Sequence, residues 1–92
     1  MSEPITREFP IINQRGLHAR ASAKFIQVAG QFDAEIHVER DGMKVGGTSI
    51  MGLMMLAASQ GSSVRVTAAG PDAKDAMQAI GDLILSRFGE EI

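Results

Sequence analysis

The sequence predicts an α+β fold: an open-faced β-sandwich in which three helices cover one face of a four-stranded antiparallel sheet, in the order β-α-β-β-α-β-α. Several segments alternate apolar and polar residues, which is typical of strands with one face in water. Between them, apolar residues recur at steps of three and four, as in helices that pack on a sheet. The chain has 92 residues and is 45% hydrophobic, so we expect one domain over residues 1–92.

The N-terminal half is expected to supply three strands and one helix. Residues 5–12, ITREFPII, combine alternation with β-branched residues, which predicts a strand. Because Pro10 lacks a backbone N–H, either the strand lies at a sheet edge or Pro10 is its last residue. Residues 19–29 have helical spacing. Residues 34–39 alternate again, and Asp41-Gly42 before MKV is a two-residue turn signal, so we expect an antiparallel hairpin.

The C-terminal half is expected to supply two helices and one strand. Residues 48–59, TSIMGLMMLAAS, predict a helix of about three turns that starts at Thr48 or Ser49, both favourable N-cap residues. Residues 62–68, SSVRVTA, alternate as a fourth strand, and Gly70-Pro71-Asp72 precedes the last helix. The apolar face of that helix is expected to contain Ala73, Ala76, Met77, Ile80, Ile84 and Phe88.

Charge and composition exclude several classes of function. The net charge is −2 and the basic residues are scattered, which disfavours nucleic-acid binding. The absence of cysteine removes disulfides, thiolate zinc sites and cysteine nucleophiles, and it fits a cytoplasmic location. No apolar run approaches the ~18 residues of a membrane span, and the first residues are unlike a signal peptide. We therefore expect a soluble cytoplasmic protein, a monomer at this size, without membrane insertion.

The stretch RGLHARASAKF, residues 15–25, places His18 where the first helix is expected to begin. Backbone N–H groups at a helix start, here those of Ala19 and Arg20, favour an anion. Arg20 adds a planar donor group that matches phosphate oxygens, and Arg15 adds a second positive charge. Imidazole, with an ordinary pKa near ~6.5, is largely neutral at pH 7 and can attack phosphorus. The segment therefore predicts an anion cradle around a nucleophile.

Position alone leaves other interpretations of His18 open. A lone histidine near a helix start is most often an exposed polar residue or a cap. Metal binding is disfavoured because His37 lies on a predicted strand and no ligand has a suitable spacing to His18, so no metal or cofactor is expected. A serine triad lacks a G-x-S-x-G elbow, and a small hydrolase with His18 as general base lacks a partnered acid.

The second predicted helix carries more apolar residues than one face can bury. Leu53 and Leu56 are assigned to the core, and Met55 is the methionine most expected to join them. The other apolar side chains are expected to form an exposed, adaptable surface on which several unlike partners dock. This surface comprises Ile50, Met51 and Met54.

Two motifs resemble those of a known family. Gly16-Leu17-His18-Ala19-Arg20 closely resembles the active-site signature of HPr, the histidine-containing phosphocarrier family of the bacterial phosphoenolpyruvate-dependent phosphotransferase system. Thr48-Ser49-Ile50-Met51-Gly52 resembles the regulatory-serine segment of the same family, at a matching distance from the histidine. The predicted order of strands and helices is also that of the family, so the resemblance covers nearly the whole chain.

The resemblance implies a phosphoryl carrier rather than a stand-alone enzyme. In that case His18 accepts a phosphoryl group from enzyme I through Nδ1 and donates it to EIIA-type proteins, with Arg20 assisting. Ser49 would be the acceptor for HPr kinase/phosphorylase, where that enzyme exists. The relay would serve either sugar uptake or a nitrogen-related regulatory branch. The alternative from another class is an interaction module that uses the same exposed helix without phosphorylation.

Three positions depart from the family pattern. Ala21 stands where many members have proline, and it retains a backbone N–H that proline would remove. Thr48 stands where a lysine often precedes the regulatory serine, and Arg15 occupies a position that is commonly small and polar. The last two bear on the choice of partners, so Arg15 is counted with the expected partner-binding residues.

Overall fold

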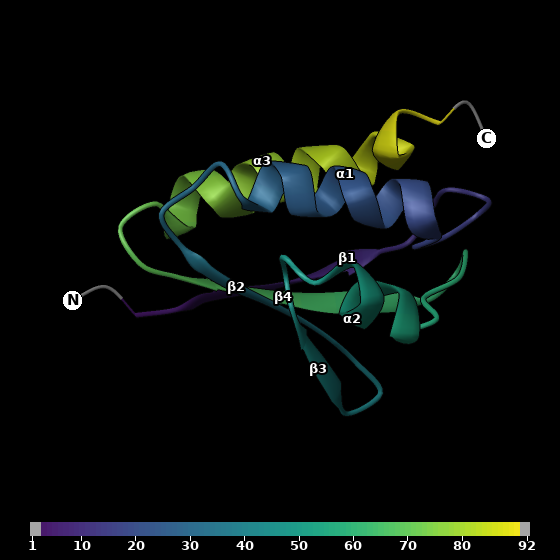
Figure 1. Ribbon diagram of the computed structural model, residues 1–92, viewed down its shortest axis with the longest axis horizontal. Coiled ribbons are helices and arrows are strands. Elements are labelled where there is room, and N and C mark those ends of the chain that lie inside the picture. The colour runs from purple at the N-terminus through teal and green to yellow at the C-terminus, as the bar shows by residue number, and fades with distance from the viewer. Residues whose placement is uncertain (1–2, 91–92) are drawn as a thin grey trace.

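The computed structural model describes residues 3–90 and confirms the predicted fold class. The strands are β1 (Ile5–Pro10), β2 (Glu35–Arg40), β3 (Met43–Gly46) and β4 (Ser63–Ala69). The helices are α1 (Ala19–Ala29), α2 (Ile50–Met55) and α3 (Ala73–Leu85), followed by a 3₁₀ turn, η1 (Arg87–Gly89). Figure 1 shows α1 and α3 side by side over one face of the sheet. Within residues 3–90, no helix has the length and apolar character needed to cross a bilayer.

The four strands form one antiparallel sheet in the order β1-β4-β2-β3. Pro10 is the last residue of the edge strand β1 and lies opposite Ser63, so its missing N–H interrupts no interior ladder. Asp41 and Gly42 connect β2 to β3 with φ angles of 51° and 82°. Positive φ at both residues is the geometry of the tight hairpin turn that the Asp-Gly pair predicts.

The two faces of the sheet differ sharply in polarity. On the helix-covered face, Val38, Val66 and Ala68 are fully buried. On the other face, the hydroxyls of Thr6 and Thr67 lie 3.2 Å apart across β1 and β4. This one-sided burial explains the alternation in the sequence, because successive side chains of a strand point to opposite faces.

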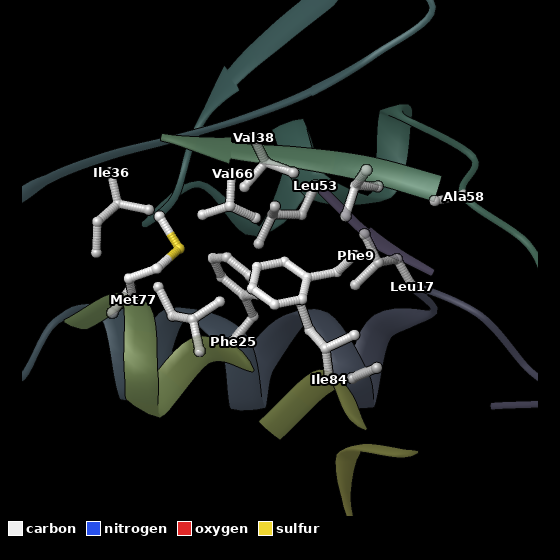
Figure 2. Packing of buried hydrophobic residues seen from close by; sticks show 14 of the residues in the cluster. Phe9, Leu17, Phe25, Ile36, Val38, Leu53, Ala58, Val66, Met77 and Ile84 are labelled. Carbon is white, nitrogen blue, oxygen red and sulfur yellow. The ribbon is translucent and has the colours of Figure 1, made fainter. Parts of the chain in front are cut away.

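The core lies between the sheet and the helices, as Figure 2 shows from close by. Phe25 of α1 is 1% exposed, and Leu53 of α2 is wholly buried. Each such side chain contributes about 1.5–3 kcal/mol through loss of apolar surface to water. Leu56, at the C-cap of α2, is also buried, so both leucines predicted for the core are confirmed.

Met55, the methionine for which core packing is most expected, does not join the core, since its side chain is 63% exposed. The second helix is also shorter than predicted, because it ends at Met55 and Ala57 adopts a positive φ of 52°. A helix of six residues buries one narrow stripe, and Leu53 with Leu56, three positions later, already fills it. Met55 lies two positions from Leu53, about 200° around the helix, and therefore faces solvent.

The prediction for Phe88 is confirmed for burial and wrong for secondary structure. Helix α3 ends at Leu85, and Phe88 lies in η1 with a φ of 54° while its side chain is wholly buried. The left-handed backbone turns the ring back into the core after the helix has ended. Lys24 of α1 secures this turn by donating a hydrogen bond from Nζ to the Phe88 carbonyl at 2.6 Å.

Candidate functional site

The site is built around the turn that precedes α1. Gly16 has a φ of 64°, and a Cβ at this position would collide with the carbonyl oxygen of Ala58. The next residue, Leu17, donates its N–H to that same oxygen at 2.9 Å. Only glycine permits both the left-handed backbone and the close approach. The turn is thereby fixed against the segment that follows α2, and the start of α1 is fixed with it.

His18 is the N-cap residue of α1, where the sequence predicts it. Its φ and ψ are −73° and −178°, its carbonyl accepts the N–H of Ser22 at 2.9 Å, and its side chain makes no capping hydrogen bond. The N–H groups of Ala19 and Arg20, the first two helical residues, have no acceptor within the helix. Both residues are exposed, so these donors lie at the protein surface beside the imidazole.

The two nitrogens of the His18 ring have different surroundings. Nε2 is hydrogen-bonded to Oε2 of Glu90, whereas Nδ1 has no hydrogen-bond partner among residues 3–90. A carboxylate accepts hydrogen bonds, so Nε2 carries a proton in this contact. In the neutral form of the ring, the lone pair is then on Nδ1. The side chain of His18 remains 23% exposed, which leaves the ring accessible.

Glu90 is held in place from its other side by Asn13. The Nδ2 group of Asn13, which is fully buried, donates to Oε1 of Glu90 and to the carbonyl of Gly16, both at 2.9 Å. Burial raises the pKa of Glu90, but hydrogen bonds from Asn13 and His18 and the nearby charges of His18 and Arg15 outweigh it and leave the pKa below its ordinary 4.5. Glu90 is therefore a carboxylate at neutral pH.

The two arginines of the predicted cradle, Arg15 and Arg20, are both exposed, but their surroundings differ. Arg15 lies close enough to Glu90 for its charge to lower the pKa of that carboxyl. Arg20 makes no side-chain hydrogen bond or ion pair within residues 3–90. Its donors are available at the surface, next to the start of α1.

Two residues of the site, Asn13 and Glu90, could not be predicted from the sequence. Glu90 is separated from His18 by 72 positions and from Asn13 by 77, so no local spacing connects them. The one signal in the sequence is weak: Gly89 after the last helix marks a turn, and an acidic residue follows it. Such a signal does not say toward which element the turn directs the acid.

The second predicted motif lies on α2. Ser49 is the N-cap residue, is exposed, and accepts the N–H of Gly52 through Oγ at 3.0 Å. Met51 is 68% exposed and Met54 is 41% exposed, as predicted for the docking surface, while Ile50 is half-buried. The carbonyl of Ala58, beyond the end of α2, contacts the turn before His18, so the methionine-bearing segment adjoins the site.

The other histidine lies apart from the site. His37 belongs to β2 and faces the uncovered side of the sheet, where its Nε2 is 3.6 Å from Oε1 of Glu35. Across residues 3–90 there is no group of three or more histidine, cysteine, aspartate or glutamate side chains placed to hold a metal ion.

Comparisons with known proteins agree with the fold and the motifs. Residues 5–86 match the family model described as "PTS HPr component phosphorylation site". A phosphocarrier protein HPr of Cupriavidus necator is 51% identical over 86 residues, which cover 94% of this chain and 97% of that protein. The HPr of Neisseria meningitidis serogroup A is 49% identical with the same coverage.

A solved structure is also similar over the full length. The crystal structure of HPr-C-His from Thermoanaerobacter tengcongensis superposes with a TM-score of 0.89 at 46% identity, and the match covers 99% of this chain and 100% of that one. Fold and sequence together define the class, a phosphocarrier protein of the phosphotransferase system. The chain belongs to the HPr family, as the motifs around His18 and Ser49 imply.

The lowered pKa of Glu90 predicts a specific pH dependence of stability. Because folding lowers this pKa below 4.5, the carboxylate adds stability above that pH, and this stability is lost as the pH falls through the folded-state value. We expect the difference in unfolding free energy between wild type and Glu90→Gln to shrink from about pH 7 to about pH 3. Urea unfolding at a series of pH values measures this difference, and a constant difference would contradict the prediction.

Proposed function

We propose that His18 is the residue that carries the phosphoryl group, accepting it from enzyme I and passing it to EIIA-type proteins. One observation supports this above the others. At the N-cap of α1, Nδ1 of a partly exposed imidazole has no partner among residues 3–90, and the unpaired N–H groups of Ala19 and Arg20 lie beside it. The family to which the chain belongs is one of phosphocarriers, which is consistent with this assignment.

The chemistry of the proposed step follows from the state of the ring. The lone pair on Nδ1 of neutral His18 attacks phosphorus and forms an N–P bond, while the bond from phosphorus to the donor breaks and its electron pair leaves with the donor. The product is a phosphoramidate, which readily gives up its phosphoryl group to a second acceptor. A carrier requires such lability.

The surroundings of His18 supply the stabilisation that the new charge needs. A phosphoryl group on Nδ1 would meet the positive end of the α1 dipole and the N–H groups of Ala19 and Arg20. The guanidinium of Arg20 provides a planar set of donors that matches two phosphoryl oxygens, and Arg15 contributes a second positive charge from the turn. These groups hold the phosphoryl group through its oxygens and leave phosphorus open to the acceptor.

The proposed docking surface adjoins this site. It is formed by Arg15, Ile50, Met51 and Met54. Methionine side chains are flexible and polarisable, so the same surface can adapt to enzyme I and to EIIA-type proteins, which differ in shape.

We also propose Ser49 as a regulatory phosphorylation site. Its exposed hydroxyl lies at the start of α2, where an added charge of about −1.5 to −2 is compatible with the backbone N–H groups of the helix. A serine phosphate is a stable ester, unlike a phosphohistidine, so it suits a lasting switch. Placed beside Ile50 and Met51, it would disturb apolar docking without unfolding the protein.

The role of His18 is tested by incubation with phosphoenolpyruvate and enzyme I. We expect an acid-labile, alkali-stable phosphoryl label on the wild type and on His37→Ala, and none on His18→Ala, because only the ring at the helix start has the cradle. Radiolabel counting with mass spectrometry measures it. Absence of label on the wild type, or label that persists on His18→Ala, would show the assignment to be wrong.

The docking surface is tested by truncating its two exposed methionines. We expect Met51→Ala with Met54→Ala to weaken binding to enzyme I about thirtyfold, since two interface anchors that each cost ~1 kcal/mol when truncated together cost ~2 kcal/mol. Calorimetric titration measures the dissociation constant. Met43→Ala is the matched control, because Met43 is 43% exposed but lies on the β2–β3 hairpin. Equal affinities for the two variants would contradict a surface on α2.

The regulatory site is tested with HPr kinase/phosphorylase and ATP. We expect an acid-stable label on the wild type and none on Ser49→Ala. The variant should stay folded, because losing one capping hydrogen bond costs only about 1 kcal/mol. A labelled Ser49→Ala, or an unlabelled wild type in the presence of active kinase, would exclude Ser49 as the acceptor.

A further inference from the structure

The hydrogen-bond chain Asn13–Glu90–His18 reaches the site from a part of the molecule outside both family motifs. Each oxygen of the Glu90 carboxylate is used: Oε1 accepts from the buried Nδ2 of Asn13, and Oε2 is bonded to Nε2 of His18. Glu90 itself is only 14% exposed in its side chain. A carboxylate that is fixed at both oxygens orients the ring to which it is bonded.

The segment that carries Glu90 is held in an unusual backbone conformation. Arg87, Phe88 and Gly89 have φ angles of 60°, 54° and 77°. Left-handed backbone costs about 1–2 kcal/mol at each residue other than glycine, so it persists only where other contacts impose it.

Those contacts are present on both sides of the segment. The Phe88 ring is wholly buried, its carbonyl accepts a hydrogen bond from Lys24, and the N–H of Glu90 bonds to the carbonyl of Arg87 at 2.9 Å. The strained turn directs the side chain of Glu90 toward the start of α1. Its geometry points to a role at that position.

We propose that Glu90 is a positioning residue for the phosphoryl transfer at His18. It holds the ring proton on Nε2, so that Nδ1 presents its lone pair beside the N–H groups of Ala19 and Arg20. This inference rests on the proposed role of His18 and adds the residue that prepares the ring for it. Asn13 acts one step further back, by fixing the carboxylate.

Glu90 also affects the energy of the step. When Nδ1 forms the N–P bond, the ring still carries the proton on Nε2 and becomes positively charged. The carboxylate of Glu90 accepts that N–H and stabilises the charge, as a hydrogen bond between ionised groups does more strongly than a neutral one. In the onward transfer, the protonated ring leaves phosphorus with the electron pair of the N–P bond and returns to the neutral Nε2–H form.

The first test separates catalysis from docking. Glu90→Gln keeps the shape of the side chain and removes its charge, so we expect the maximum rate of phosphoryl acceptance from enzyme I to fall about tenfold. The KM for enzyme I should change less than about twofold, because the contacts that bind enzyme I before the chemical step are not altered. Glu35→Gln is the matched control, since it removes the carboxylate beside the other histidine, and it should keep the wild-type rate.

The second test needs no partner protein. In ¹⁵N-labelled wild type, the Nε2 of His18 should show a directly bonded proton that exchanges slowly with water, and this signal should be lost in Glu90→Ala. The signal of His37 serves as the internal reference. Thermal unfolding of each variant confirms that it is folded, and if Glu90→Ala is unfolded, Glu90→Leu provides the same comparison, because leucine has a similar size and no hydrogen-bond acceptor.

The outcomes distinguish this inference from the function on which it rests. A wild type without label would remove the role of His18 itself. If His18→Ala is unlabelled but Glu90→Gln keeps the wild-type rate, the carrier function stands and the positioning role is wrong. A proton on Nδ1 in the wild type, or a raised KM with an unchanged maximum rate, would equally overturn it.

Discussion

The close contact between the Gly16–Leu17 turn and the carbonyl of Ala58 is the constraint on which the site depends. It fixes the start of α1 against the segment that follows α2, because Gly16 leaves no side chain between the two backbones. The cap residue His18 and the unpaired N–H groups after it are thus held next to the segment that follows α2. A side chain at position 16 would push the turn before His18 away from the segment that follows α2, although position 16 takes no part in the chemistry.

The charges around His18 leave one side of its ring open to an anion. Glu90 occupies the Nε2 side of the ring, whereas the helix start lies open to a group on Nδ1. The carboxylate is satisfied by Asn13 and the ring, so it does not compete for the donors of Ala19 and Arg20. The ring is thereby held by a negative charge on one side and leaves the positive surroundings on the other side to the phosphoryl group.

Features with a local cause could be predicted from the sequence, and features with a distant cause could not. The bounds of α1 and the Asp41-Gly42 hairpin follow from spacing and turn chemistry, and the structure has both. Burial of Phe88 follows from hydrophobicity, but its left-handed backbone is imposed by packing against α1. The Glu90 contact combines that backbone with a separation of 72 positions, so no periodicity in the sequence encodes it.

The two histidines show why residue type alone does not define this site. His37 also has a glutamate neighbour, Glu35, at 3.6 Å, but that carboxylate is 78% exposed and the pair stands on an open sheet face. This contact is worth little there, because water and salt screen charges on an exposed face. His18 differs by its position at a helix start, where unpaired N–H groups stabilise an added anion, and by a glutamate that a buried amide holds still. Topology therefore supplies what the imidazole alone lacks, a fixed orientation and a place for the negative charge.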